Sequence, residues 1–511
     1  MSSHIDKKLI AKNTMFLYVR MFVLMAVNLF AFRILLKELG VDNYGIYNVI
    51  GGVVVLFAFI NAALSQSTQR YLSYYIGKGL HKDITNLFSM SVNVHAFFGV
   101  AFLVIAETLG LWIVYNVLKF PPTSMTQVFW LYQVSVATFV VNLIRAPYNS
   151  AIVSYEKFSF FSYLSIAEAV LKLAGVYCLG YLAPQFRLVS YGLLVFFIVI
   201  ICWVSSICFL KKTVTTIYFK RYWDKSMFKS LMAFNGWNMV GGISNIAANQ
   251  GLNMVFNVFC GVVVNAAMGV STQVYSAVNS FVTNFQTAFN PQITKSYAAG
   301  EKTEFFNFVF STSRLSFCLM FVLGLPVIAG CSDILHLWLT DVPDFSVRFT
   351  QLMLVFCMID ALSGPLWVSA QAVGNIRNYM LLMSGLIMLN IPLAIILLYI
   401  DVSPVYVFVG RVLINLITHF VRIAYLRKLI GFPAEAYMKK VMLPALAACA
   451  ICSPIVWAVA DVVTGIPGMI TSVSVALLLS AVTSFYIVLE KNERAFALSS
   501  LKKLRRKFSN A

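Results

Sequence analysis

Residues 66–91 read QSTQRYLSYYIGKGLHKDITNLFSMS, and residues 287–312 read TAFNPQITKSYAAGEKTEFFNFVFST. The second stretch lies 221 residues after the first and repeats its plan. Each stretch is the polar end of a long apolar run, and each has basic positions, a glycine, an acid and an asparagine before apolar residues resume. Gly79 is matched by Gly300. Because the same shift holds without a gap over residues 13–91, the sequence predicts two matched halves.

The composition indicates a membrane protein. Of the 511 residues, 60% are hydrophobic and only 11% are charged, which is far from the usage of soluble domains. A helix needs about 20 apolar residues to cross a hydrocarbon core of about 30 Å, and such windows recur along the whole chain. We therefore predict an all-α polytopic membrane protein with fourteen spans: 14–36, 44–65, 91–117, 126–148, 160–182, 188–210, 230–259, 262–290, 308–330, 349–372, 379–400, 404–425, 441–460 and 467–489.

The distribution of Lys and Arg predicts the topology. With the N-terminus inside, 29 of the 38 basic residues lie in segments predicted to be cytoplasmic, and the predicted external loops hold four. This is the asymmetry that the positive-inside rule describes. The formal charge of +19 is then mostly a topology signal, and nucleic acid is not an expected partner. We expect an inner (cytoplasmic) membrane protein with both termini in the cytoplasm, whose basic tail either rests on anionic lipids or is simply solvated.

Several kinds of chemistry leave no trace in the sequence. The nine cysteines lie within or beside apolar spans, without the spacing of a metal site. The sequence also contains no phosphate-binding loop of the GxxxxGK[ST] type. We therefore predict no catalytic residues, metal or cofactor. We expect any transport to be driven by a gradient, for example of H⁺ or Na⁺, or by the asymmetric distribution of the substrate itself.

The repeat also predicts how the chain is divided. One repeat distance covers six spans, an even number, so both copies enter the membrane from the same side. We expect an N-terminal lobe at residues 1–210, a basic cytoplasmic linker at 211–229 and a C-terminal lobe at 230–428. Residues 429–511 then hold the last two spans and the basic tail.

Residues 33–79 carry a family resemblance. They contain the pattern R-x5-LG-x3-YGIY and a basic exit with a glycine from the second span. This stretch resembles the first hairpin of Wzx-type polysaccharide flippases of the MOP superfamily, which also contains MATE transporters and lipid II flippases. The resemblance implies two six-helix lobes around a cavity that opens alternately to each side, with two further C-terminal helices.

The resemblance also implies a substrate and a setting. The expected substrate is an undecaprenyl-pyrophosphate-linked oligosaccharide, such as the repeat unit of an O-antigen, lipopolysaccharide or capsule. The expected state is a monomer in the phospholipid membrane, alone or associated with the polysaccharide assembly machinery.

Moving such a substrate requires cations for the pyrophosphate and neutral polar side chains for the sugars. For the sugars, the candidates are Asn245, Asn249 and Asn253, at steps of four in the seventh span, and Gln273 in the eighth. Hydrogen bonding between helices is the alternative role for these amides. For the pyrophosphate, the candidates are Arg33, Arg145, Lys172 and Arg411.

Some of these cations have a plainer explanation. Lys172 follows Glu168 by four residues, a spacing that favours a structural ion pair. Arg33 and Arg314 lie near span ends, where their side chains could snorkel to the interface. Glu107 and Asp360 are the candidates for coupling to H⁺ or Na⁺, because a buried carboxylate can exchange a proton.

Two other classes of protein stay open. A MATE-type cation-coupled multidrug or small-molecule antiporter would resemble its family in an acidic site in the first lobe, but the first two apolar runs contain no Asp or Glu. A membrane enzyme that acts on polyprenyl-linked sugars would need a sizeable loop beside the membrane. The longest predicted external loop, residues 331–348, is short, and we predict that the protein is not an enzyme.

Overall fold

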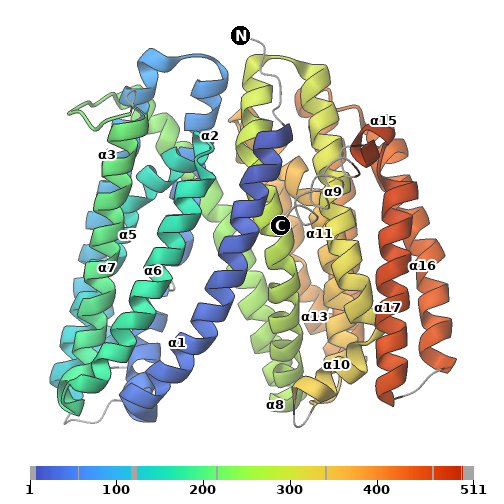
Figure 1. The fold of residues 1–511 in the computed structure, drawn as a ribbon, viewed down its shortest axis with the longest axis horizontal. Coiled ribbons are helices and arrows are strands. Elements are labelled where there is room, and N and C mark those ends of the chain that lie inside the picture. The colour runs from blue at the N-terminus through green and yellow to red at the C-terminus, as the bar shows by residue number, and fades with distance from the viewer. Residues whose placement is uncertain are drawn as a thin grey trace, which may run out of the picture. The chain divides into compact units, whose positions relative to one another are not determined.

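The computed structural model describes residues 7–55, 57–116, 124–214, 217–339, 342–462, 465–495 and 498, and within these ranges it is helical without a strand. The chain forms two compact units (Figure 1). The first unit is Met1–Gly242 with Thr294–Ala299, and the second is Ile243–Ile293 with Gly300–Ala511. The predicted lobe boundaries stay a prediction.

The first unit is built from seven helices and the ends of an eighth. They are α1 (Lys7–Val55), α2 (Ala58–Gly77), α3 (His81–Ile105), α4 (Leu111–Asn116), α5 (Met125–Ser154), α6 (Phe158–Cys178), α7 (Pro184–Thr213) and the ends of α8 (Lys225–Ala299). A π-helical turn, Ala106–Gly110, joins α3 to α4 without a break in the helical path.

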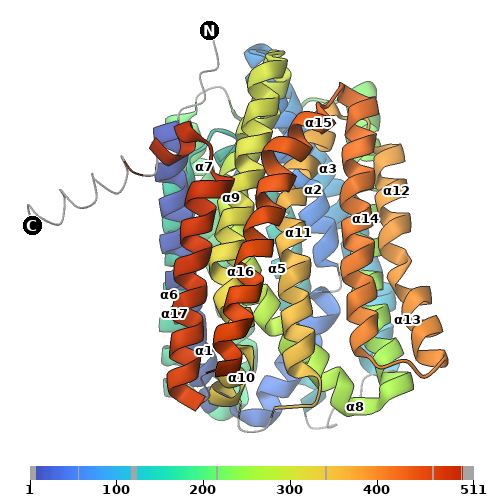
Figure 2. The same ribbon diagram turned by 90° about the vertical axis from the view of Figure 1, so that its right-hand side faces the viewer.

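The second unit holds the middle of α8 and all later helices. These are α9 (Lys302–Ala329), α10 (Cys331–Trp338), α11 (Ser346–Val373), α12 (Arg377–Met388), α13 (Asn390–Tyr399), α14 (Val405–Ile430), α15 (Ala434–Tyr437), α16 (Leu443–Val462) and α17 (Gly465–Thr483). Figure 2 shows α16 and α17 beside α9.

Ten helical stretches among the described residues are long and apolar enough to cross a membrane. They coincide with the predicted third to sixth and ninth to fourteenth spans, so the prediction of an all-α polytopic membrane protein is confirmed. The other four predicted spans lie on α1, α2 and α8, which are not among these ten stretches. The count of fourteen stays a prediction.

Helix α8 turns back on itself, although its helical path runs unbroken over 75 residues. Near its start, the Ser230 hydroxyl lies 3.0 Å from the hydroxyl of Tyr71 on α2. Near its end, the backbone of Lys295 lies so close to Gly77, also on α2, that a Cβ at Gly77 would meet its carbonyl oxygen at 2.6 Å. A straight helix would separate Ser230 from Lys295 by roughly 100 Å at 1.5 Å per residue. The fold-back agrees with the prediction of two spans in this region.

The two repeated stretches adopt the same turn. Gly79 has φ +70° after α2, and Gly300 has φ +85° after α8. Glycine enters this left-handed region without the steric cost that a Cβ brings, which makes it the usual residue just beyond the end of a helix. The helices that follow start 221 residues apart, at His81 and Lys302. The predicted repeat is therefore visible in the backbone.

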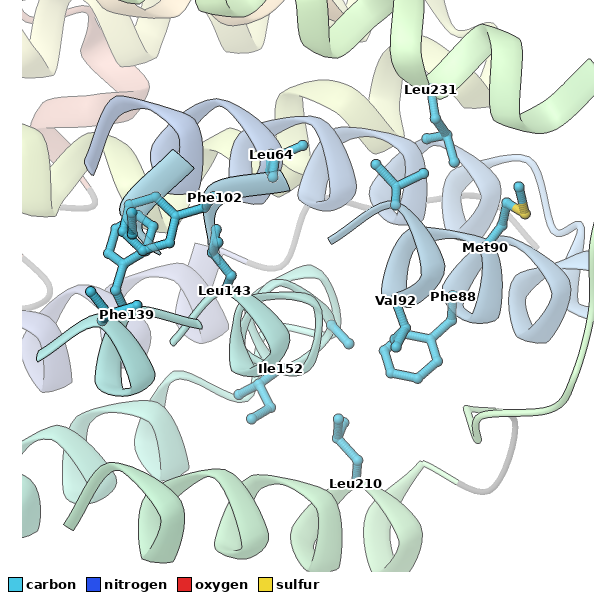
Figure 3. Packing of buried hydrophobic residues seen from close by; sticks show 14 of the residues in the cluster. Leu64, Phe88, Met90, Val92, Phe102, Phe139, Leu143, Ile152, Leu210 and Leu231 are labelled. Atoms are coloured by element: carbon cyan, nitrogen blue, oxygen red, sulfur yellow. The ribbon is translucent and has the colours of Figure 1, made fainter. Parts of the chain in front are cut away.

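The core of the first unit holds α5 in place. Figure 3 shows Phe102 of α3 packed against Phe139 of α5. Their ring centroids are 4.3 Å apart. Leu64, Leu143 and Ile152 are fully buried in the same cluster. Close packing of this kind, rather than transfer out of water, associates helices within a bilayer. It gives the polar residues of α5 a rigid support.

The C-terminal helices are held to the second unit by a buried cation. Arg314 of α9 is almost fully buried, and its guanidinium donates to the Glu493 carboxylate at 2.6 and 3.1 Å. It also lies 3.2 Å from the carboxylate of Glu490. Both carboxylates follow the last predicted span, 467–489, so the expectation that Arg314 snorkels to the interface stays a prediction. The carboxylates that neutralise it come from the far end of the sequence, which spacing along one helix could not indicate.

Candidate functional site

A charged cluster lies inside the first unit, where α5 meets α6. Glu168 accepts a hydrogen bond from Lys172 at 2.8 Å and from Arg145 at 2.9 Å. The pair of Glu168 and Lys172 is the one that their spacing on a helix predicts, and it is present. Arg145 comes from α5, just before Pro147, and its side chain is 8% exposed. The carboxylate is therefore bound by two cations at once.

A third cation, Arg20 of α1, approaches the same carboxylate. Its guanidinium stacks on the ring of Phe161 at 4.7 Å, and it lies close enough to Glu168 to interact electrostatically. We call Arg20, Arg145, Glu168 and Lys172 the Glu168 cluster. Three cations around one carboxylate leave a surplus of two positive charges. In addition, the buried Nε atoms of Arg20 and Arg145 have no hydrogen-bond acceptor among the described residues.

Glu107 lies elsewhere in the first unit, in the π-helical turn. Its carboxylate accepts a hydrogen bond from Gln133 of α5 at 3.0 Å. The Tyr132 hydroxyl donates to the carbonyl of Ala106 at 2.7 Å, which secures the same turn. Turns of this kind inside α-helices are frequent at functional sites. Glu107 is thus positioned by a neutral partner and keeps its charge available.

The second unit has a cluster of different character, built from α8, α11 and α14. Arg411 of α14 donates to the Asn249 side-chain oxygen at 2.7 Å, and its guanidinium lies 5.0 Å from the ring centroid of Phe356. Asp360 of α11 is close enough to interact electrostatically with Arg411 and with Arg422. We call Asn249, Asp360, Arg411 and Arg422 the Asp360 cluster.

The carboxylate of this second cluster, that of Asp360, is not fixed by a partner among the described residues. Within the described ranges of the chain, Asp360 makes no hydrogen bond and no ion pair. Arg422 instead donates to the Ser363 carbonyl at 3.1 Å, and the Ser363 hydroxyl lies 2.7 Å from Nδ1 of His419. Arg411 and Arg422 are thus hydrogen-bonded to neutral groups. Asp360 is half-buried and interacts with both arginines electrostatically, without a hydrogen bond to either.

The remaining candidates are distributed along α1 and α8. The side chain of Arg33 lies outside the described residues. Asn245 accepts through its backbone carbonyl from Asn249 at 2.9 Å, so these two stay on one face of α8 as the step of four predicts. Asn253 is half-buried one turn further on, and Gln273 is exposed. Of the candidate cations and amides, the structure brings together Arg145 with Lys172, and Asn249 with Arg411.

Apart from Glu168, which the sequence pairs with Lys172, two residues of these clusters were not among the predicted site residues, namely Arg20 and Arg422. Arg20 is distant in sequence from Glu168, and no spacing rule connects α1 with α6. Arg422 belongs to a stripe of polar side chains on α14 with Arg411 and His419, at steps of eight and three that return to one helical face. The spacing of this stripe could have identified Arg422 as a candidate site residue from the sequence. The structure places Arg422 buried within α14.

The described part of the chain contains no group of three or more His, Cys, Asp or Glu side chains that could hold a metal ion.

The sequence matches no protein-family model and no curated protein. Its structure is similar to solved structures of MATE transporters. A MATE P26A mutant superposes with a TM-score of 0.72 at 14% identity, over 85% of this chain and 97% of that one. The outward-facing form of a multidrug resistance MATE family transporter of the MOP superfamily superposes with a TM-score of 0.72 at 13% identity, over 83% of this chain and 96% of that one.

A third similar structure is a MOP superfamily transporter from Pyrococcus furiosus, with a TM-score of 0.70 at 14% identity, over 84% of this chain and 96% of that one. Its description reports a binding pocket of reverse polarity that suggests a different function. The chain therefore has the fold of MATE transporters, which confirms the MATE-like architecture. At this level of identity the likeness concerns the fold alone.

Proposed function

We propose that the protein is a transporter that flips an undecaprenyl-pyrophosphate-linked oligosaccharide across the inner membrane by alternating access. The observation that carries this proposal is the surplus of two positive charges in the Glu168 cluster. A surplus of charge around the buried Arg145 is costly inside a membrane protein unless a counter-charge is available. A pyrophosphate is a matching counter-charge, and guanidinium groups bind phosphate oxygens with two hydrogen bonds.

The polar face of α8 supports the sugar part of the proposal. Asn245, Asn249 and Asn253 follow one another at steps of four on α8, which carries further amide side chains such as Asn238 and Asn284. Amide groups at this depth can replace the water that a sugar hydroxyl loses. Asn249 is already fixed by Arg411, so a ligand on this face would meet a preorganised donor in its Nδ2 group.

In this proposal, Asp360 is the residue that couples transport to a gradient of H⁺ or Na⁺. Its carboxylate lies between two arginines and has no hydrogen bond to the described residues. A carboxylate in this position can bind a proton or Na⁺ and lose it again, which changes its attraction for the neighbouring guanidinium groups. Glu107, which accepts a hydrogen bond from Gln133, is a second candidate for the same task.

The proposal is tested with purified protein in liposomes that contain a fluorescent undecaprenyl-pyrophosphate-linked sugar. The fraction of the label that an impermeant quencher reaches reports transfer between leaflets. We expect the wild type to accelerate transfer and Arg145→Gln to abolish the acceleration, with Arg145→Lys as the charge-preserving control. Equal transfer by liposomes with and without the protein would refute the proposed substrate.

One alternative has an observation in its favour. The fold is that of a multidrug resistance MATE family transporter, and Asp360 offers a negative charge that an organic cation could use. Deletion of the gene should then increase susceptibility to cationic drugs and leave lipid-linked sugars evenly distributed. The opposite outcome, accumulation of lipid-linked repeat units on the cytoplasmic leaflet, favours the flippase.

A further inference from the structure

We propose that the segment 217–229, which follows α7 and includes the first residues of α8, is a membrane anchor that binds the headgroups of anionic phospholipids. Its outward residues, here called the linker surface, are Tyr218, Phe219, Arg221, Trp223 and Lys225. This inference stands apart from the proposed substrate, since it concerns the bilayer itself.

The segment is pinned to α3 instead of extending into solvent. The backbone N–H of Lys220 donates to the Ser89 hydroxyl at 3.0 Å, and the Asn93 side chain donates to the Tyr222 carbonyl at 2.9 Å. Ile217 is buried beside these contacts. Figure 1 shows the segment as a green loop beside the upper part of α3. The contacts fix which side chains point inward and which point away.

Those contacts also set the depth of the segment. Ser89 and Asn93 lie eight and twelve residues after the first residue of α3, which corresponds to roughly 12 and 18 Å along the helix axis. The predicted apolar span of this helix begins at residue 91. The headgroup layer on each side of a bilayer is about 5–8 Å thick. A segment tied to both Ser89 and Asn93 therefore lies at the level of the headgroups and not beyond them.

The side chains that point outward from the segment are of the types expected at the level of the lipid headgroups. Tyr218, Phe219 and Trp223 are exposed by 52%, 51% and 62%. Three large aromatic side chains exposed on one short segment are unusual in water, whereas Trp and Tyr are enriched where the bilayer meets water. Together they form an apolar surface with polar tips.

This aromatic surface continues into the outer face of α3. The ring of Trp223 packs on Phe228 at 4.9 Å, and Phe228 packs on Phe97 of α3 at 6.2 Å. Phe97 is followed on the same helical face by Val100 and Val104, which are exposed by 62% and 56%. Exposed apolar residues on a spanning helix face lipid chains. Trp223 thus stands at the boundary between the lipid-facing stripe and the basic residues of the segment.

The charge of the linker specifies the headgroup. Residues 211–229 contain six Lys or Arg and a single acid, Asp224. That acid is occupied, because it accepts from the backbone N–H groups of Ser226 at 2.7 Å and Met227 at 3.0 Å. Arg221, Lys225 and Lys229 are exposed beside the aromatic residues. Basic residues attract anionic lipids at this position, and neighbouring aromatic rings insert between them.

The test uses the full-length protein in lipid nanodiscs and the fluorescence of Trp223. Of the eight tryptophans, Trp223 is isolated as the difference between the wild type and Trp223→Phe. Brominated phosphatidylglycerol and brominated phosphatidylcholine, at the same mole fraction, are the two probes. We expect brominated phosphatidylglycerol to quench the Trp223 signal severalfold more strongly than brominated phosphatidylcholine. In the triple variant Arg221→Gln, Lys225→Gln and Lys229→Gln, we expect the two lipids to quench equally.

The matched control is Lys439→Gln with Lys440→Gln, which removes exposed positive charge from another predicted cytoplasmic segment and should leave the preference intact. Inorganic pyrophosphate in the buffer separates a lipid headgroup from a free anion, and it should not displace the lipid. Equal quenching by both lipids in the wild type, an absence of Trp223 quenching, or displacement by pyrophosphate would each overturn the proposal.

Discussion

The Glu168 cluster and the Asp360 cluster lie in the two units of one repeated fold, yet their carboxylates differ in the ion pairs that they make. Glu168 is bound by Arg145 and Lys172, whereas Asp360 makes no ion pair within the described part of the chain. The arginines near Asp360 are held by neutral groups instead. The repeat therefore reproduces the backbone but not the arrangement of charge. Under the proposed function, the first cluster would bind the anionic part of the substrate and Asp360 would serve the coupling.

The largest effect is expected from Arg145→Gln, which removes the connection between α5 and the Glu168 carboxylate. A lost hydrogen bond to a charged group costs roughly 1.5–3 kcal/mol of stability. Transport of a pyrophosphate-linked substrate should fall by about tenfold or more, the factor that 1.4 kcal/mol represents. Thermal unfolding in detergent and transfer in liposomes measure the two effects. If Arg145→Gln were stable and fully active, the Glu168 cluster would not be a binding site.

The next largest effect is expected from Asp360→Asn. Its comparison with Glu168→Gln should distinguish the role of the carboxylate in the Asp360 cluster from its role in the Glu168 cluster. Because Asp360 has no hydrogen bond or ion pair to lose among the described residues, we expect its unfolding temperature to stay close to that of the wild type. The response of transport to an imposed H⁺ or Na⁺ gradient should disappear. Glu168→Gln is the matched control and should lower stability instead. A gradient response that survives in Asp360→Asn would remove this residue from the coupling.

A third change makes the second cluster resemble the first. Asn249→Asp places a carboxylate at the oxygen that now accepts from Arg411 at 2.7 Å. Ion pairs between partly exposed groups contribute about 0–1 kcal/mol, so stability should rise slightly or not at all. Transport should decrease severalfold, because Arg411 becomes neutralised. Asn245→Asp, one helical turn away, serves as the control, and equal effects at both positions would contradict the specific role of Arg411.

The smallest effect is expected outside both clusters, at Asp224. The backbone N–H groups of Met227 and Ser226 hold the pKa of this carboxyl below its usual range. Its contribution to stability is therefore complete above the ordinary pKa of an aspartate and is lost as the pH falls through the lowered value. Unfolding of the wild type and Asp224→Asn should differ slightly at neutral pH and converge in acid. Divergence on acidification would contradict the assigned bonds.

Much of the fold was accessible from the sequence because membrane helices are specified locally. Ten of the predicted spans coincide with helices that can cross a membrane. The left-handed turns at Gly79 and Gly300 follow from a repeat that pairs the two glycines. The pair of Glu168 and Lys172 needed only the geometry of one helix. The contact of Asn245 with Asn249 is of the same local kind.

Contacts between distant helices were not accessible in this way. The approach of Arg20 to Glu168 and the bond from Arg145 to Glu168 depend on how α1, α5 and α6 pack, and periodicity along one helix carries no information about that packing. The burial of Arg314 was missed for the same reason. The position of a cation near a span end does not reveal that a carboxylate far along the chain supplies the neutralising charge.

The bond between Arg314 and Glu493 also imposes an order on biosynthesis. The two residues are 179 positions apart. At about 5–20 residues per second, roughly 10–35 s pass between the synthesis of the cation and that of its partner. During this interval α9 carries a cation without its final counter-charge, so it must wait near water, near lipid headgroups or against the insertion machinery. The second unit is consequently completed only when the last helices arrive, and shortening the chain before residue 490 would leave its assembly unfinished.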